Sequence, residues 1–268
     1  MYHSFKNDCK QIYDKKEILP HLRFGKNTLV SKVGIVEAIL FRLKTGCQWR
    51  ELPVEKFFRK KHSWQLVYYY FRKWSLDGTW EQVWLILLSK HKSLLDLSSI
   101  QLDGTHTPSK RGGLSVEYQG RKKCKTTNML MITDSNVIPL SCSEPIAGNH
   151  HDSYNLNHHF ETMLTDIEKA DIPTRWLFLN ADSGFDTTDF RACCFKKDII
   201  DNIDFNKRNG GQRDCLFDEL LYKNRFVIER TNAWMDAFKA LLVRFETKNQ
   251  TWKALNLLAF SVILLRLL

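Results

Sequence analysis

The sequence has little of what marks secreted, fibrous or membrane proteins. Its seven cysteines are an odd number without a Cys-x-x-Cys pair, which favours reduced thiols. Only 12 glycines and 6 prolines occur, with no repeat or low-complexity tract, and this excludes collagen-like and disordered chains. The longest apolar run, residues 255–268, is shorter than the roughly 20 residues that a membrane span needs. Because no signal peptide precedes the chain either, we expect a soluble, cytoplasmic protein.

The net charge of +10 is confined to the first third of the chain. Residues 1–95 contain 18 basic and 8 acidic side chains, whereas residues 96–268 contain 22 of each. A basic part joined to a neutral part indicates that one region binds a polyanion while the other does something else.

Residues 1–95 show helical periodicity. Apolar side chains recur at steps of three and four over about 31–45 and 62–75, and again from 79 onward, with tight turns between. This pattern predicts a small all-α domain resembling a helix-turn-helix module, or alternatively a helical cap that touches no nucleic acid. Five tryptophans are expected in its core: Trp49, Trp64, Trp74, Trp80 and Trp84.

Short apolar runs replace this periodicity in residues 96–268. Strands are predicted at 99–102, 128–133, 137–143, 176–180 and 199–205, with helices at about 154–170, 187–197, 225–246 and 252–267. The order of strand, hairpin, helix, strand, helix, strand and helix predicts a mixed α/β sheet of the ribonuclease-H-like class.

Two aspartates follow apolar runs and stand beside glycines. Asp103 comes directly after a predicted strand, and Asp182 follows another, each with a glycine within two residues. Acids at the ends of buried strands suit a cation site at a sheet edge, since ligands bind there in open α/β sheets. Each aspartate taken alone is as readily a turn or helix-cap residue.

A third acid lies on a predicted helix. Tyr222, Arg225, Glu229, Asn232 and Asp236 recur at steps of three and four and so share one face, which could also be a solvated surface with an Arg225–Glu229 pair. Converging carboxylates that hold two Mg²⁺ ions are the usual arrangement for phosphoryl transfer.

These motifs resemble the DDE transposases of bacterial insertion sequences, in the group named for insertion sequence five. The resemblance spans roughly residues 20–265, and its motifs occur in the family's order. They are Asp103-Gly104-Thr105, residues 181–186, Tyr222-x2-Arg225-x3-Glu229, residues 45–53 and 71–80, and residues 148–153 with His151 and Asp152.

The resemblance implies a DNA transposase. Residues 1–95 would recognise the terminal inverted repeats of its own element, and the ribonuclease-H-like residues 96–268 would cut these ends and join the 3′-hydroxyls to target DNA. Asp103, Asp182 and Glu229 would hold Mg²⁺, with Mn²⁺ as a substitute. The protein would act as a homodimer or larger assembly on double-stranded DNA, at the bacterial nucleoid.

Several residues, all of them basic except one tyrosine, are expected to meet DNA phosphates. Charge runs are usually solvated, but these flank the strand ends that offer the acids. The candidates are Tyr222 and Arg225 on the helix, Lys207 and Arg208, and Arg121, Lys122 and Lys123.

Three further residues bear on this resemblance. The family has a Lys or Arg seven residues after the glutamate, and this chain has Asp236 there. His151 and Asp152 are expected to support the site or contact DNA, because the spacing of the nearby histidines fits no zinc motif.

Two other functions remain open. A helix-turn-helix regulator would need no set of three acids. A structure-selective nuclease of the same fold would cut DNA and not join it.

Overall fold

In the computed structural model, the described residues are 22, 24, 30–206 and 217–267. The first helices are α2 (Lys32–Thr45), α3 (Trp64–Leu76) and α4 (Thr79–Lys90), with short 3₁₀ turns η2 (Trp49–Glu51), η3 (Val54–Lys56) and η4 (Lys92–Leu94). Ser31 accepts a hydrogen bond from the Gly34 amide at the start of α2, and left-handed Gly46 (φ 66°) ends this helix. The three helices predicted for this region are therefore present.

The sheet combines antiparallel and parallel pairs. Its strands are β1 (Ile100–Pro108), β2 (Glu117–Gln119), β3 (Cys124–Thr133), β4 (Pro139–Cys142), β5 (Ile146–Ala147), β6 (Phe178–Ala181) and β7 (Ile200–Ile203). β3 lies antiparallel to β1 and to β4, while β6 lies parallel to both β1 and β7. The resulting order β4-β3-β1-β6-β7, in which β3 runs antiparallel to β4, is that of the ribonuclease-H-like fold and confirms the predicted class.

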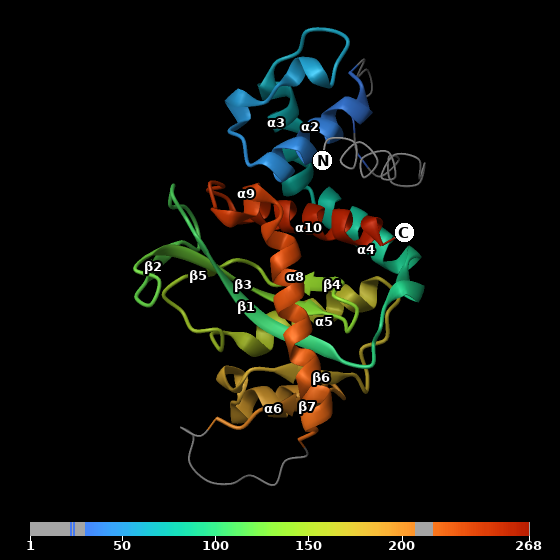
Figure 1. Ribbon diagram of the computed structural model, residues 1–268, viewed down its shortest axis with the longest axis vertical. Coiled ribbons are helices and arrows are strands. Elements are labelled where there is room, and N and C mark those ends of the chain that lie inside the picture. The colour runs from blue at the N-terminus through green and yellow to red at the C-terminus, as the bar shows by residue number, and fades with distance from the viewer. Residues whose placement is uncertain (1–21, 23, 25–29, 207–216, 268) are drawn as a thin grey trace.

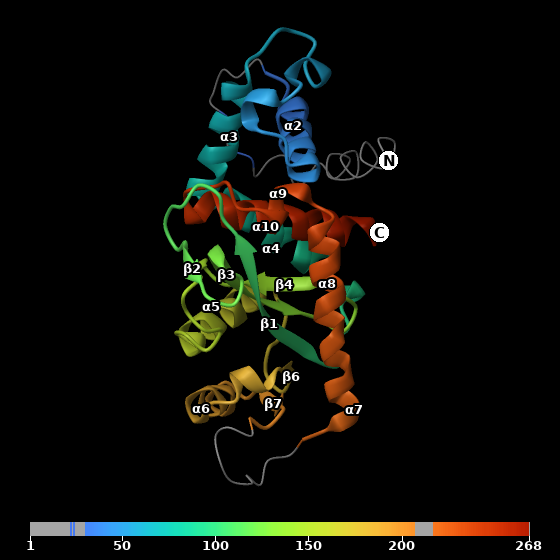
Figure 2. The same ribbon diagram turned by 60° about the vertical axis from the view of Figure 1, so that its left-hand side comes forward.

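Helices cover both faces of the sheet. α5 (Leu156–Lys169) and α6 (Thr188–Lys196) lie on one face, and α8 (Val227–Asp236) crosses the other (Figure 2). Thr231 of α8 donates a hydrogen bond to the Val137 carbonyl, which ties this helix to the β3–β4 turn. The sheet is therefore a middle layer, as buried strands require.

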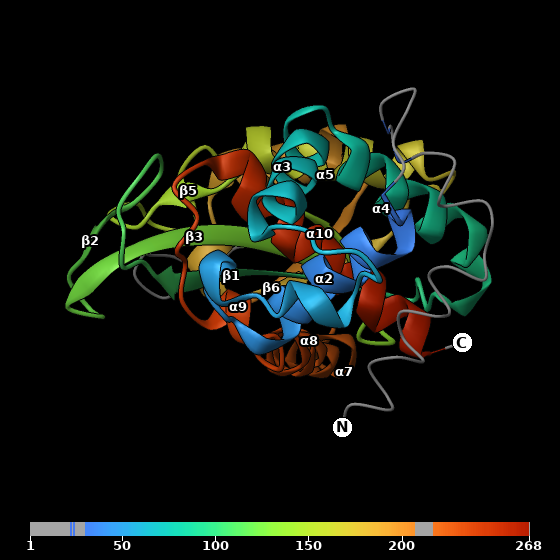
Figure 3. The ribbon, with the colours of Figure 1, turned by 90° about the horizontal axis from the view of Figure 1, so that it is seen from above.

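The N-terminal helices and the sheet share one hydrophobic core. α10 (Asn249–Arg266) lies between α2 and α3 on one side and the sheet on the other (Figure 1, and from above in Figure 3), and its side chains are buried from Thr251 to Leu265 with the exception of Asn256. Trp84 of α4 packs edge-on against Phe260 of α10, with the ring centroids 5.5 Å apart, and donates a hydrogen bond to the Leu140 carbonyl of β4. Residues 32–90 are thus anchored to the last helix of the chain. No helix among the described residues has the length and apolar character to cross a membrane.

One long helix predicted for residues 225–246 is wrong. The chain instead forms α7 (Glu219–Tyr222), a 3₁₀ turn η7 (Lys223–Phe226), α8 and then α9 (Lys239–Leu242). Asp218 caps α7 by accepting hydrogen bonds from the amides of Leu220 and Leu221, so the helical stretch begins earlier than expected. Arg244 instead forms a bridge to Ser109 beside the end of β1, which ends helical structure before residue 246.

Candidate active site

The register between β1 and β6 brings Asp103 and Asp182 together. These parallel strands pair from Ile100 with Leu179 to Leu102 with Ala181, and each aspartate is the next residue along the chain. β1 does not end before Asp103 as predicted but continues to Pro108 along β3. The two carboxylates therefore stand where β1 and β6 cease to pair.

The Asp103 carboxyl group is held in an unfavourable environment for its charge. Its pKa is raised to about 6, first by burial and then by the nearby charges of Asp152 and Asp182, against a hydrogen bond from the Gly104 amide (2.8 Å) and the charge of Arg225, which lower it. The positive charge around ionised Asp103 thus does not offset its burial and the neighbouring carboxylates. A divalent cation would supply that charge.

Arg225 lies beside both aspartates. Its Nη1 is 3.9 Å from Oδ2 of Asp182, and its charge lowers the pKa of Asp103. The guanidinium carbon is 5.4 Å from the ring centroid of Tyr222 and 5.0 Å from that of Phe226, while Nε is buried without a hydrogen-bond partner. Arg225 and Tyr222 therefore lie together beside the aspartate pair.

Glu229 is not brought to the aspartate pair. Its side chain is exposed on α8, three residues before Asn232, which accepts a hydrogen bond from Thr105 of β1 (3.2 Å). A 3₁₀ turn advances about 120° per residue and an α-helix about 100°, so η7 changes the face on which Tyr222 and Arg225 lie relative to Glu229. Among the described residues, no group of three His, Cys, Asp or Glu side chains is placed to hold a metal ion.

Asp152 lies closer to Asp103 than the sequence indicated. A Cβ added to Gly104 would stand 2.2 Å from Oδ1 of Asp152, so this glycine leaves room for the carboxylate. Asn128 of β3 donates to the same oxygen (2.6 Å), and its own Oδ1 is buried without a partner. The signal in the sequence was the glycine directly after Asp103, because a side chain there would exclude Asp152. His151 is exposed.

The predicted basic residues divide into two groups. Arg121, Lys122 and Lys123 are exposed between β2 and β3, and Lys122 is tied to β1 by a hydrogen bond from Nζ to the His106 carbonyl (2.6 Å). Lys207 and Arg208 lie outside the described residues. Asp236 is exposed at the end of α8.

The donor set fits a hard divalent cation. Asp103 and Asp182 offer carboxylate oxygens, which Mg²⁺ and Mn²⁺ prefer over nitrogen or sulfur. The raised pKa of Asp103 has burial as its first cause, and a cation would offset that burial by pairing with the ionised form.

Two family models match the chain. Residues 102–265 match the family described as "DDE superfamily endonuclease", and residues 16–84 match the family described as "Putative transposase of IS4/5 family". No curated protein sequence matches the chain.

Two solved structures match at a distance. One is described as "Crystal structure of a pre-cleavage Mos1 transpososome" (10% identity, 82% of this chain and 80% of that chain, TM-score 0.32). The other is "Mos1 transposase paired-end complex with left transposon end" (12% identity, 87% and 77%, TM-score 0.32). At these TM-scores the fold assignment depends on the strand order and not on this likeness. Since the first family model spans more than half of the sequence, the chain belongs to the DDE superfamily of endonucleases, and the expected DDE transposase is confirmed.

Proposed function

We propose that this transposase cleaves the ends of its own insertion element and joins the resulting 3′-hydroxyls to target DNA. The observation that carries the proposal is the β1–β6 register, which sets Asp103 and Asp182 side by side with Arg225 against them. Two carboxylates on neighbouring parallel strands, with an arginine beside them, suit a phosphodiester whose charge must be held while it reacts.

Each residue then has a defined task. Asp103 and Asp182 hold Mg²⁺ or Mn²⁺, which when bound polarises phosphoryl oxygens and activates a nucleophile. Arg225 binds a non-bridging phosphate oxygen through its guanidinium group, and the Tyr222 ring keeps that group in place by packing against it. One site serves both cutting and joining, because each is an in-line displacement at phosphorus with one oxygen entering and one leaving.

Glu229 is proposed as the third carboxylate. It lies on the helix that packs on β1, and its place in the Tyr-x2-Arg-x3-Glu motif supports the role although its side chain is exposed here. Asp152 is proposed to fix the position of the Asp103 segment through Gly104 and Asn128.

DNA is proposed to run from this site along the basic side chains. Arg121, Lys122 and Lys123 would hold backbone phosphates, as would Lys207 and Arg208. Recognition of the element ends is assigned to residues 1–95, whose +10 charge supports it. A homodimer or larger complex would pair the two ends, in the cytoplasm where bacterial DNA lies.

The test is an end-joining reaction. A labelled duplex carrying the native element end, taken from the inverted repeats that flank the gene, is incubated with the protein, Mg²⁺ and a supercoiled target plasmid. We expect a nick that leaves a 3′-hydroxyl and then labelled plasmid. Cleavage without joining would favour a nuclease. A protein that binds DNA and whose activity is unchanged by Asp103→Asn would favour a regulator.

A further inference from the structure

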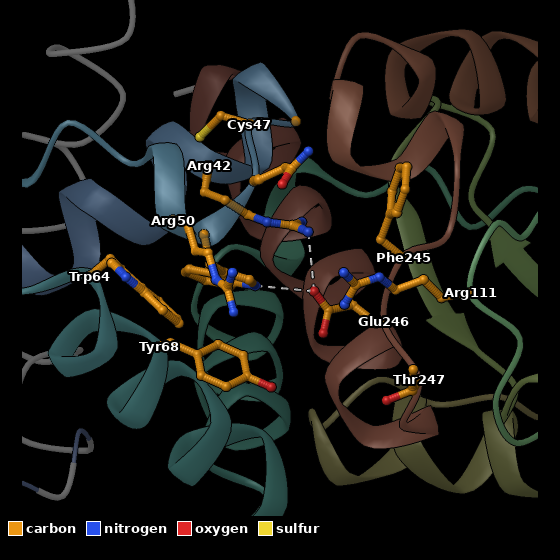
Figure 4. Close-up of a pocket in the computed structure, with 12 residues that line it drawn as sticks. Arg42, Cys47, Arg50, Trp64, Tyr68, Arg111, Phe245, Glu246 and Thr247 are labelled. Atoms are coloured by element: carbon orange, nitrogen blue, oxygen red, sulfur yellow. Dashed lines mark hydrogen bonds and ion pairs between the residues drawn. The ribbon is translucent and has the colours of Figure 1, made fainter.

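A cavity lies away from the aspartates, between the N-terminal helices and the segment before α10 (Figure 4). Its volume is about 510 Å³, within the roughly 300–1,000 Å³ of small-ligand sites. None of the candidate catalytic residues lines it. The lining side chains used below are Arg42, Trp49, Arg50, Trp64, Tyr68, Arg111, Phe245 and Glu246.

Aromatic rings face this cavity from two sides. Trp64 and Tyr68 of α3 lie on one side and Phe245 on the other, as Figure 4 shows. Trp49 supports the first wall, with its ring centroid 5.2 Å from that of Tyr68. Phe245 is 49% exposed, so its ring is accessible to a ligand in the cavity.

Positive charge gathers around the same cavity. Buried Glu246 neutralises one guanidinium, since its Oε1 accepts from Arg42 Nη2 (3.1 Å) and from Trp49 Nε1 (3.4 Å). Arg42 is 4% exposed, and its Nε and Nη1 have no hydrogen-bond partner. Arg50 and Arg111 are exposed, and neither is paired with a carboxylate among the described residues. Two cationic side chains are therefore available beside the aromatic walls.

Aromatic walls beside free arginines match one class of ligand. An unpaired base stacks on aromatic side chains, and arginine binds the attached phosphate. A base inside a duplex is covered by its neighbours on both faces and cannot enter such a cavity. We propose that the cavity binds one unpaired nucleotide of a DNA strand, with its base against Trp64, Tyr68 or Phe245 and its phosphate at Arg50 and Arg111.

The bound nucleotide belongs to a polynucleotide and not to the free pool. Both phosphate-binding arginines are exposed at the rim, which leaves room for the strand to continue on either side. This inference rests on the proposed function, in which DNA is the substrate. It adds a place where DNA is held single-stranded at one position outside the catalytic site.

The experiment measures binding of the full-length protein to a fluorescently labelled ten-nucleotide single strand and to the corresponding duplex, at one low salt concentration. We expect Trp64→Ala and Phe245→Ala each to weaken single-strand binding about fivefold to a hundredfold. Duplex binding should change less than twofold. Trp64→Phe should retain single-strand binding, because phenylalanine still offers an aromatic face.

Trp176→Ala is the matched control, since Trp176 is 66% exposed and lies outside the cavity. Circular dichroism and melting temperature establish that each variant is folded. Arg50→Gln with Arg111→Gln should weaken single-strand binding and reduce its salt dependence.

Three results would overturn the assignment. The first is that Trp64→Ala and Phe245→Ala both bind the single strand as tightly as the wild type. The second is that only the arginine variant loses single-strand binding. The third is that free dAMP competes with the labelled strand as strongly as the unlabelled oligonucleotide does. If the wild-type protein bound neither DNA form, the proposed function itself would fail, which separates the two claims.

Discussion

Replacing Asp103 by asparagine should abolish cleavage and yet stabilise the metal-free protein. Burial, then the charges of Asp152 and Asp182, raise the pKa of the Asp103 carboxyl from 3.8 to about 6. Its ionised form, which prevails at neutral pH, is therefore less stable in the folded protein than in the unfolded chain. Asparagine has nearly the same shape, carries no charge, and its oxygen still accepts from the Gly104 amide.

The size of the effect follows from the pKa. A rise from 3.8 to about 6 corresponds to roughly 3 kcal/mol, since each pKa step is worth about 1.4 kcal/mol. Solvent at this partly exposed site screens some of it, so we expect Asp103→Asn to raise the free energy of unfolding by about 1–3 kcal/mol at pH 7.5. For a chain of this size that is roughly 2–10 °C in melting temperature.

The raised pKa of Asp103 also makes the stability of the protein depend on pH. The folded wild type keeps a proton on Asp103 between about pH 4 and 6 that the unfolded chain has released, so wild-type stability falls as pH rises through this window. Asp103→Asn lacks this loss. The difference between the two proteins should be near zero below pH 4 and level off above pH 7.

Urea unfolding in EDTA, from pH 4 to 8, measures this difference. Adding Mg²⁺ or Mn²⁺ should stabilise the wild type and leave the variant unchanged, because ligand binding to the folded state raises stability. Asp198→Asn is the control: it breaks an exposed pair with Arg175 (2.5 Å) and should lose at most about 1 kcal/mol. If Asp103→Asn were less stable than wild type in EDTA at pH 7.5, the account of an electrostatically strained site would be refuted.

Three other substitutions test separate parts of the structure. Gly104→Ala would place a Cβ 2.2 Å from Oδ1 of Asp152, so we expect at least a tenfold loss of end cleavage with an unchanged circular dichroism spectrum. Arg244→Ala removes a fully buried guanidinium that donates four hydrogen bonds, and urea unfolding should show a loss of about 3–5 kcal/mol, against at most about 1 kcal/mol for exposed Arg175→Ala. Asp236→Lys, at an exposed position, should tighten binding to element ends at low salt and less so at high salt. If the variant and the wild type had equal affinity at both salt concentrations, Asp236 would lie away from DNA.

The aspartate pair was predictable because local signals agreed with the fold. An acid after a buried apolar run, with glycine beside it, predicts the end of a strand, and Asp103 and Asp182 both stand where β1 and β6 stop pairing. The sequence did not indicate that β1 continues past Asp103, since residues 103–108 lack strong apolar alternation and are ordered by β3.

The positions of Glu229 and Asp152 were less accessible to sequence reasoning. A uniform helical period placed Glu229 on the face of Tyr222 and Arg225, and the 3₁₀ turn η7 breaks that period. Asp152 reaches Gly104 through the path of the chain after β5, which no local pattern encodes.

The tryptophans show the same limit. Helical spacing predicted five core rings, and Trp74, Trp80 and Trp84 are buried. Trp49 and Trp64 are only partly buried and line the cavity opposite Phe245. Their partner segment comes from the far end of the chain, so spacing within residues 1–95 could not separate these two from the core.

Cleavage of a labelled element end by single-residue variants tests the central claim most directly. Asp103→Asn, Asp182→Asn and Glu229→Gln are compared with wild type and with Asp198→Asn at equal DNA occupancy in Mg²⁺. The account predicts that the first three lose cleavage by at least a thousandfold, about 4 kcal/mol of transition-state stabilisation, while Asp198→Asn stays within twofold of wild type. Near-wild-type cleavage by any of the three would contradict the assignment of that residue to the metal site.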